Sequence, residues 1–104
     1  MVDIIRKALD LDNIIIKKHA LMRMHQRKVD SEELIKVIFD CDIIERYDKD
    51  RPFPSFLLLG YSDNRPLHIV LSYDLESESI FIITVYEPSE LIWESDFKTR
   101  RKQL

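Results

Sequence analysis

The apolar residues of the first 28 positions recur at the spacing of α-helices. Ile5 and Leu9 lie four residues apart, which predicts a short helix over Val2–Leu9. An apolar run at 14–16 leads into a basic stretch, for which a second helix is predicted. The buried side of that helix is predicted from three clustered apolar residues, Ala20, Leu21 and Met24.

A third helix is predicted to begin at a capping signal. Asp30 and Glu33 have the D-x-x-E spacing of a capping box, and Lys28–Val29 would form the turn before it. Four residues then recur at helical spacing and should form one buried stripe: Leu34, Val37, Ile38 and Cys41.

From Asp42 onward the pattern changes to short runs typical of β-strands. The runs are rich in Ile, Val, Leu, Phe and Tyr, and comprise Ile43–Tyr47, Phe56–Tyr61, Leu67–Tyr73 and Ser79–Tyr86. The connections at 62–66 and 74–78 have hairpin lengths, so an antiparallel meander is the simplest pairing. Helices precede strands, which predicts an α+β fold with the N-terminal helices packed on one face of a four-stranded antiparallel sheet.

The composition fits one small domain over residues 1–104. Cys41 is the only cysteine, and the three histidines have no spacing suited to structural zinc, so no disulfide, metal or other cofactor is expected. No apolar run reaches the ~18 residues of a membrane span. We therefore expect a cytoplasmic protein that does not associate with membranes.

Charge is distributed unevenly along the chain, whose net charge is −3. Residues 17–28 hold five Lys or Arg, two His and no acid, whereas residues 74–96 hold seven acids and no base. A second basic island follows at 98–102, in a tail predicted to be exposed over 98–104. Contacts with RNA should therefore be local rather than spread over the surface.

A helix over the basic stretch would place His19, Arg23 and Arg27 in one column, because residues four apart are neighbours on a helix. Arginine matches the geometry of phosphate, and histidine titrates near neutral pH. Such a column could bind a phosphate and move a proton, as metal-free RNA cleavage requires. The alternative is a solvated stripe whose long side chains cover the edge of the core.

Other residues admit two interpretations each. His68 is either a structural histidine or a second acid or base, and either face of its strand could be the buried one. Tyr86, which shares a strand face with Thr84, is either a half-buried aromatic or a contact for phosphate or a base. Trp93 is expected to be a core anchor. The tail, with Arg100 and Arg101, either solubilises the chain or follows a phosphate backbone.

Several motifs together resemble a family of short bacterial and archaeal proteins. They are H-A-L-M-R-M-H-Q-R at 19–27, the helix start at 29–33, P-L-H-I-V at 66–70, I-T-V-Y-E-P at 83–88, and Trp93 followed by K-T-R at 98–100. The resemblance covers residues 14–102. That family is filed as a domain of unknown function, and its genes often lie beside a small zinc-finger antitoxin of the YgiT/MqsA type. Its members are thought similar to the RelE, BrnT and MqsR toxins, in the barnase/EndoU/colicin/RelE-like nuclease group.

The resemblance implies a RelE/BrnT-like fold and a metal-independent endoribonuclease, the toxin of a type II toxin–antitoxin pair with a cognate antitoxin. It implies His19, Arg23 and Tyr86 as catalytic residues, with Arg27 and Thr84 as contacts to RNA. We add three cations as RNA contacts: Lys28, Arg100 and Arg101. The alternative is a non-catalytic α+β module that binds a protein partner or RNA through its basic helix and tail. The acidic body argues against dependence on the ribosome.

Overall fold

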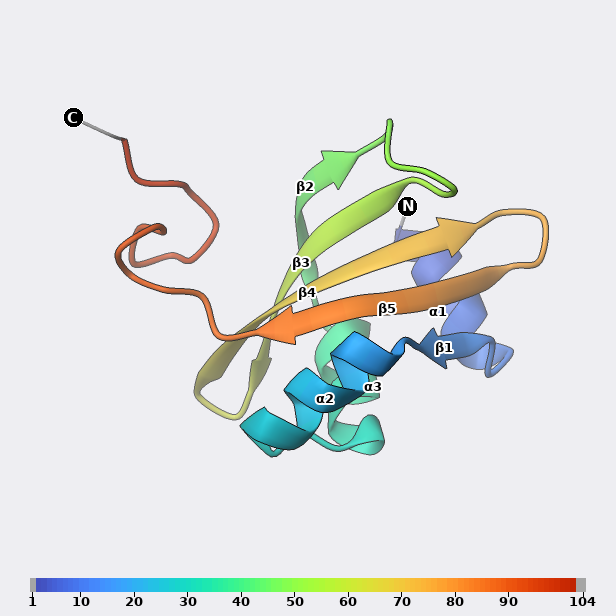
Figure 1. Cartoon of the computed structure of the whole chain (residues 1–104), viewed down its shortest axis with the longest axis horizontal. Coiled ribbons are helices and arrows are strands. Elements are labelled where there is room, and N and C mark those ends of the chain that lie inside the picture. Colours follow the sequence, from blue (N-terminus) through green and yellow to red (C-terminus); the bar gives the residue numbers. More distant parts are fainter. Residues whose placement is uncertain (1, 103–104) are drawn as a thin grey trace.

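The computed structural model describes residues 2–102, which form three helices and five strands (Figure 1). In chain order the elements are α1 (Val2–Asp10), β1 (Ile14–Ile16), α2 (Lys18–Arg27), α3 (Ser31–Phe39), β2 (Asp42–Tyr47), β3 (Ser55–Ser62), β4 (Arg65–Asp74) and β5 (Ser79–Tyr86). The α+β class is confirmed, and the four predicted strands lie where the alternating pattern placed them. None of the helices within residues 2–102 is both long and apolar enough to cross a membrane.

The sheet differs from the predicted four antiparallel strands in one addition. Its order is β1-β5-β4-β3-β2, and β2 to β5 form the expected antiparallel meander. Ile14–Ile16, expected only to lead into the second helix, forms the fifth strand and pairs with β5 in parallel, which makes the sheet mixed. Two backbone hydrogen bonds extend the pairing of β1 with β5 at its two ends: Ile80 N–H donates to Asn13 O and Lys17 N–H donates to Ile82 O, each at 3.0 Å.

One hydrophobic core lies between the helices and the sheet. The face of β4 that carries Leu67, Ile69 and Leu71 is fully buried against it, which settles the face that the sequence left open. All three helices contribute buried residues, including Ile5, Ala8, Ala20, Met24, Leu34, Val37 and Ile38. We call this the core face of the sheet, and the opposite side the outer face.

Gly60 allows α3 to lie directly on β3. A Cβ atom at this position would meet Val37 Cγ1 at 2.5 Å and the Val37 carbonyl oxygen at 2.8 Å. Real Cβ atoms do not approach so closely, and backbone cannot give way as the end of a flexible side chain can. The only glycine of the chain therefore sets the distance between this helix and the sheet.

Of the two hydrogen bonds that a capping box would form at the start of α3, the structure contains one. The N–H of Glu33 donates to Asp30 Oδ1 at 2.8 Å, as a capping residue requires. The Glu33 carboxylate turns instead to the β3–β4 hairpin, where it accepts from Ser62 Oγ and lies 4.0 Å from the guanidinium of Arg65. The same side chain thus ties α3 to the sheet rather than closing the capping box.

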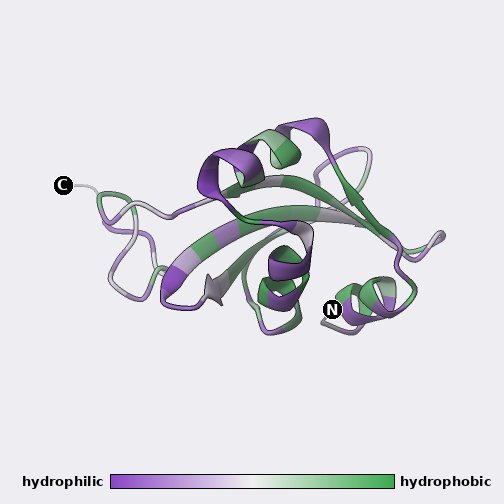
Figure 2. Ribbon diagram, turned by 90° about the horizontal axis from the view of Figure 1, so that it is seen from below, coloured by the Kyte–Doolittle hydropathy of each residue, from purple (hydrophilic) through white to green (hydrophobic). Residues whose placement is uncertain are grey.

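α2 lies along β5 rather than over the middle of the core face. It contacts β5 beyond the end of β1, and its own end at Arg27 O accepts from Arg65 Nη1 at 2.5 Å. Figure 2 shows α2 beside the sheet and apart from α1 and α3, with much of its ribbon hydrophilic. From this position along β5, α2 adds Ala20 and Met24 to the same core as α1 and α3.

Residues 89–102 form a C-terminal segment without helices or strands, which extends beyond the end of β5 (Figure 1). Its chain turns back on itself, with an isolated bridge between Trp93 and Arg100 and a bond from Arg101 N–H to Ile92 O at 2.8 Å. The predicted basic tail is thus folded at 98–102, and its last two positions, 103 and 104, lie outside the described residues.

Candidate functional site

The outer face of the sheet carries one group of polar side chains that could act on a substrate. Cross-strand pairing places Tyr86 directly opposite His68, and Thr84 opposite Val70. Leu59 pairs with His68 from the other side. Because directly paired residues point to the same face, these five side chains lie together on the outer face.

His68 is fully buried on this face and satisfied at both ring nitrogens. Nε2 lies 2.7 Å from the carbonyl oxygen of Phe97, and Nδ1 lies 3.2 Å from Tyr86 Oη. A carbonyl can only accept, so Nε2 carries a proton; in the neutral imidazole Nδ1 then accepts the Tyr86 hydroxyl proton. Burial lowers the pKa of His68, which favours this neutral form. The structural interpretation of His68 is thereby supported.

Tyr86 is half-buried, with its hydroxyl bonded to His68. Burial raises the pKa of Tyr86, so that the phenol keeps its proton at neutral pH. A separation of 3.2 Å is long for a hydroxyl donor, which makes the bond to Nδ1 a weak one. The Tyr86 hydroxyl at the end of β5 therefore keeps its proton, and it can leave its weak bond to His68 to donate to another acceptor.

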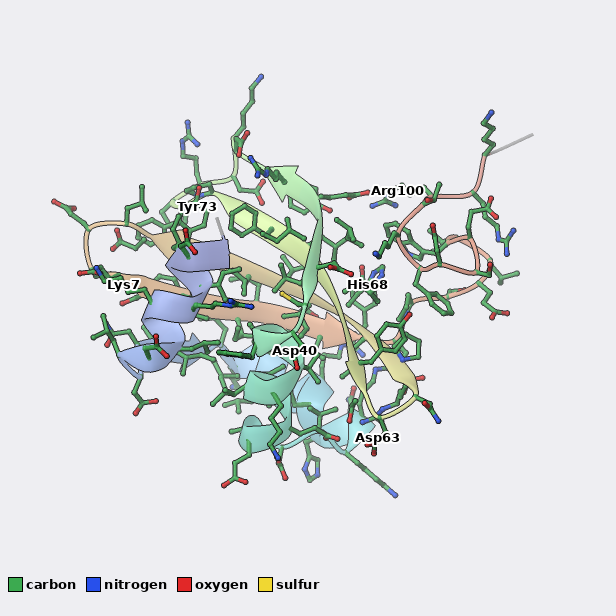
Figure 3. All side chains as sticks on the ribbon, turned by 180° about the vertical axis from the view of Figure 1, so that it is seen from behind. Lys7, Asp40, Asp63, His68, Tyr73 and Arg100 are labelled. Carbon is green, nitrogen blue, oxygen red and sulfur yellow. The ribbon has the colours of Figure 1, made fainter. Side chains whose placement is uncertain are left out.

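Trp93 and Arg100 cover the His68–Tyr86 pair from the C-terminal segment. The indole is 2% exposed and packs edge-to-face on the His68 ring, with centroids 4.7 Å apart. The guanidinium of Arg100 lies 4.5 Å from the centroid of the indole. Figure 3 shows His68 between the strands and this segment, with Arg100 on the segment itself. Trp93 is an anchor as expected, but it anchors the outer face rather than the main core.

Arg100 is held in place by Glu45 of β2. Its Nε and Nη2 donate to the two carboxylate oxygens at 2.8 and 3.1 Å, in the two-bond geometry that arginine favours. The bond from Arg100 lowers the pKa of Glu45. Tyr47 Oη donates to the same carboxylate at 2.5 Å, and burial together with this bond raises the pKa of Tyr47 to about 12.

The carbonyl that binds His68 comes from a tight turn. Phe97 has φ of 58°, a left-handed conformation that is unusual for an aromatic residue. Asp96 stabilises the turn, because its carboxylate accepts from the N–H groups of Lys98 and Thr99 at 2.9 and 3.0 Å. These bonds lower the pKa of Asp96. The turn therefore fixes the second partner of the buried imidazole.

The predicted column on α2 lies on one flank of that helix. His19 and Arg23 are exposed and Arg27 is half-buried. The hollow between α2 and the start of α3 is lined by a different set: Met24, His25, Lys28, Val29 and Asp30. The column is thus on the flank turned away from α3. Lys28 itself has φ of 58° and ends the helix.

Within residues 2–102, His19 and Arg23 of this column make no direct hydrogen bond with Tyr86. Arg23 Nη1 donates to Gln26 Oε1 at 3.3 Å, and no hydrogen bond or ion pair within residues 2–102 links His19 or Arg23 to the phenol. The Nε atom of Arg27 is buried and lacks a partner among these residues. Two groups of candidate residues therefore exist, one on α2 and one on the outer face, with β5 between them.

Three cations of the C-terminal segment, Lys98, Arg100 and Arg101, are exposed but paired. Lys98 Nζ lies 3.0 Å from Asp42 Oδ2, and Arg101 Nη1 lies 3.1 Å from Glu94 Oε2. With Arg100 bound to Glu45, this segment docks on acids of the chain itself. That pairing reduces the positive charge that Arg100 and Arg101 could offer to RNA.

Residues 16–87 of the chain match a protein family described as a domain of unknown function, DUF4258. The chain belongs to this family. The match includes α2, α3 and strands β2 to β5, and it ends just before Pro88, so the DUF4258 region contains His68 and Tyr86 but not Trp93 or Arg100. No curated protein and no solved structure matches the chain.

The sequence indicated the candidate residues of α2 more readily than the interactions among residues of the outer face. The contribution of Glu45 was missed, because its partner Arg100 is 55 residues away in the chain. Alternation alone would place Glu45 on the same face as Ile43, which packs against the core. The register shift of β2 between these two residues brings Glu45 to the outer face instead. Cys41, predicted to lie in the buried stripe of the third helix, is partly buried against the core. Burial raises the pKa of its thiol to about 11, which disfavours a nucleophilic thiolate.

Proposed function

We propose that the chain is a metal-independent endoribonuclease that acts as the toxin of a type II toxin–antitoxin pair. The observation that carries the proposal is the arrangement about β5. A helix flank with exposed His19 and Arg23 borders this strand, and the protonated phenol of Tyr86 stands on its outer face. Resemblance to the RelE and BrnT toxins, which also implies a related fold, supports the same chemistry.

The proposed reaction is a transesterification within RNA. His19 takes the proton of a 2′-hydroxyl, whose oxygen attacks the adjacent phosphorus. The bond from phosphorus to the 5′ oxygen breaks, and Tyr86 gives its proton to that leaving oxygen. Arg23 binds the phosphate oxygens, where negative charge develops. The products are a 2′,3′-cyclic phosphate and a free 5′-hydroxyl, and solvent returns the proton from His19 to Tyr86.

His68 positions Tyr86 in this scheme. Its bond to the Phe97 carbonyl fixes the tautomer, so the acceptor nitrogen always faces the phenol. The long bond to Nδ1 lets the hydroxyl turn toward a substrate at small cost. Arg27, Lys28 and Thr84 are proposed as contacts to the RNA backbone. Arg100 and Arg101 have a smaller part, because Glu45 and Glu94 already bind them.

The test is cleavage of RNA by the purified chain in EDTA. Wild-type protein should give fragments that end in cyclic phosphate, while His19→Ala, Arg23→Ala and Tyr86→Phe should be slower by roughly 100-fold or more, the usual loss for an acid, base or charge-stabilising group. The matched control is His25→Ala, a histidine of the same helix on the other flank, which should cleave like the wild type. Wild-type protein no more active than His19→Ala and Arg23→Ala would remove the proposal.

Toxicity and the antitoxin are tested separately in cells. Expression of the chain alone should slow growth, expression of Tyr86→Phe should not, and co-expression of a zinc-finger antitoxin of the YgiT/MqsA type should restore growth. Normal growth with wild-type protein that cleaves RNA in vitro would overturn the toxin assignment while leaving the nuclease.

A second function is a non-catalytic module that binds a protein partner or RNA. It is favoured by the saturation of the outer-face cluster, because both nitrogens of His68 are bonded and Arg100 is paired with Glu45. In that case His19→Ala would leave every phenotype intact, while reversing the charges of Arg23 and Arg27 would abolish binding.

A further inference from the structure

A small hollow on the outer face lies beside the proposed cleavage site. Its volume is about 210 Å³, and it is open to solvent. The lining residues come from the loop between β2 and β3 and from three strands: Asp50, Arg51, Pro52, Phe53, Ser55, Val70, Ser72 and Ile83. Nothing in the roles given above to α2, Tyr86 or His68 uses this hollow.

The walls of the hollow include a flat aromatic ring and aliphatic side chains, and four of its eight lining residues are polar: Asp50, Arg51, Ser55 and Ser72. Phe53 is half-buried and stacks on Phe81 with centroids 5.4 Å apart and an angle of 4° between the rings. Val70 and Ile83 add aliphatic walls. Ser72 is only 9% exposed, and its hydroxyl has no hydrogen-bond partner within the described part of the chain, residues 2–102. A flat ring with a polar edge fits such a lining.

Cations border this hollow where a phosphate backbone would run. Exposed Arg51 is the cation on the rim itself. Lys17 lies further off and does not line the hollow; its ammonium is 5.2 Å from the centroid of Phe81, the ring on which Phe53 stacks. One acid, Asp50, also lines the hollow, and its carboxylate accepts from Ser55 Oγ. The hollow is far smaller than a typical pocket for a whole drug-sized ligand, and is suited to a single ring system.

The register of β4 sets the distance to the cleavage site. His68, Val70 and Ser72 follow one another on the outer face, so Ser72 lies about 13 Å from His68 at the usual rise of a strand. Thr84 faces Val70, midway along this line. A single strand of RNA that placed its phosphate at Tyr86 could thus lay a neighbouring nucleotide along β4.

We propose that this hollow is a subsite for one nucleobase of single-stranded RNA, which stacks on Phe53 and bonds at its edge to Ser72. The subsite rests on the proposed function, because it assumes that RNA occupies the outer face. Stacking on an aromatic side chain contributes most of the binding of an unpaired base, and a hydroxyl distinguishes bases by their edges. The hollow therefore gives the enzyme a preference at a nucleotide next to the cleaved bond.

The experiment measures binding of fluorescent 2′-O-methyl RNA oligomers, which cannot be cleaved, by fluorescence anisotropy with the full chain. Phe53→Ala should weaken binding roughly 5- to 150-fold, the range for loss of one stacked base. Phe53→Tyr should restore it. The matched control is Phe39→Ala, whose half-exposed ring packs on Arg6 at the end of α3 and away from the outer face. That variant should bind like the wild type.

A second measurement locates the base. Oligomers that lack one base at successive positions should bind weakly to the wild type at one position only, and Phe53→Ala should lose that distinction. Ser72→Ala should change which base is preferred there without the full loss of affinity. Equal affinities of wild type, Phe53→Ala and Phe39→Ala would overturn the subsite alone. Wild-type protein that binds no oligomer would overturn the subsite and the proposed function together.

Discussion

The buried imidazole of His68 should make the stability of the fold depend on pH in a narrow window. Its pKa is lowered in the folded state because burial disfavours the charged ring. The charged groups near it, Glu45 and Arg100, act in opposite directions and are weaker than burial. In the unfolded chain the ring returns to the ordinary pKa of histidine, about 6.5. Below that pH the unfolded state therefore binds more protons than the folded state.

The sign and size of the effect follow from this difference. The stabilising effect of a neutral His68 is fully present above pH 6.5 and is lost as the pH falls below it. For one proton the free energy of unfolding changes by at most about 1.4 kcal/mol per pH unit. Half of the unfolded chains already carry the proton at pH 6.5, so a fall from pH 6.5 to 5.5 should destabilise the chain by up to about 1 kcal/mol. That is an appreciable fraction of the stability of a small domain.

Urea unfolding at a series of pH values between 5.5 and 8 would measure this dependence. His68→Gln keeps an N–H donor for the Phe97 carbonyl but does not titrate, so its free energy of unfolding should change much less between pH 6.5 and 5.5. His19→Ala and His25→Ala remove exposed histidines and should keep the wild-type slope. If His68→Gln keeps the wild-type slope as well, the dependence comes from other groups and the reasoning is refuted.

Three further changes test the packing. Gly60→Ala should lower the free energy of unfolding by about 1–3 kcal/mol, because its methyl group meets the side chain and carbonyl of Val37; an unchanged melting temperature would contradict this. Asp30→Ala should cost about 0.5–2 kcal/mol in urea unfolding through loss of the cap of α3, whereas Asp30→Asn should retain most of it. Arg100→Lys should shift the fluorescence emission of Trp93 to the red, because lysine lacks the planar group that covers the indole; an unshifted spectrum would show that the contact is not formed in solution.

The helices and the meander could be predicted because their signals are local. The alternation of Leu67, Ile69 and Leu71 marks a strand, and Asp30 marks the start of α3 wherever the rest of the chain lies. The parallel strand Ile14–Ile16 could not be predicted in this way. It is three residues long, and its partner, residues 80–82, is more than 60 positions away in the chain. Only the packing of the whole fold selects that pairing.

The candidate site was harder to predict than the fold, because both faces of β4 are covered. A buried outer-face residue such as His68 cannot be distinguished from a core residue by alternation alone. What covers it is the C-terminal segment, whose basic residues predict an exposed tail but pair with two distant acids of β2, Asp42 and Glu45. Charge pairing over such distances in the chain leaves no local pattern.

The DUF4258 region ends at residue 87, ahead of both groups that seal the imidazole. A protein trimmed to residues 16–87 would retain His68 and Tyr86, yet it would lack the indole above the ring and the carbonyl that holds Nε2. Water would then reach the imidazole, and its tautomer would no longer be fixed. Relatives that differ after this point could thus share the same strands while presenting an uncovered, freely titrating histidine.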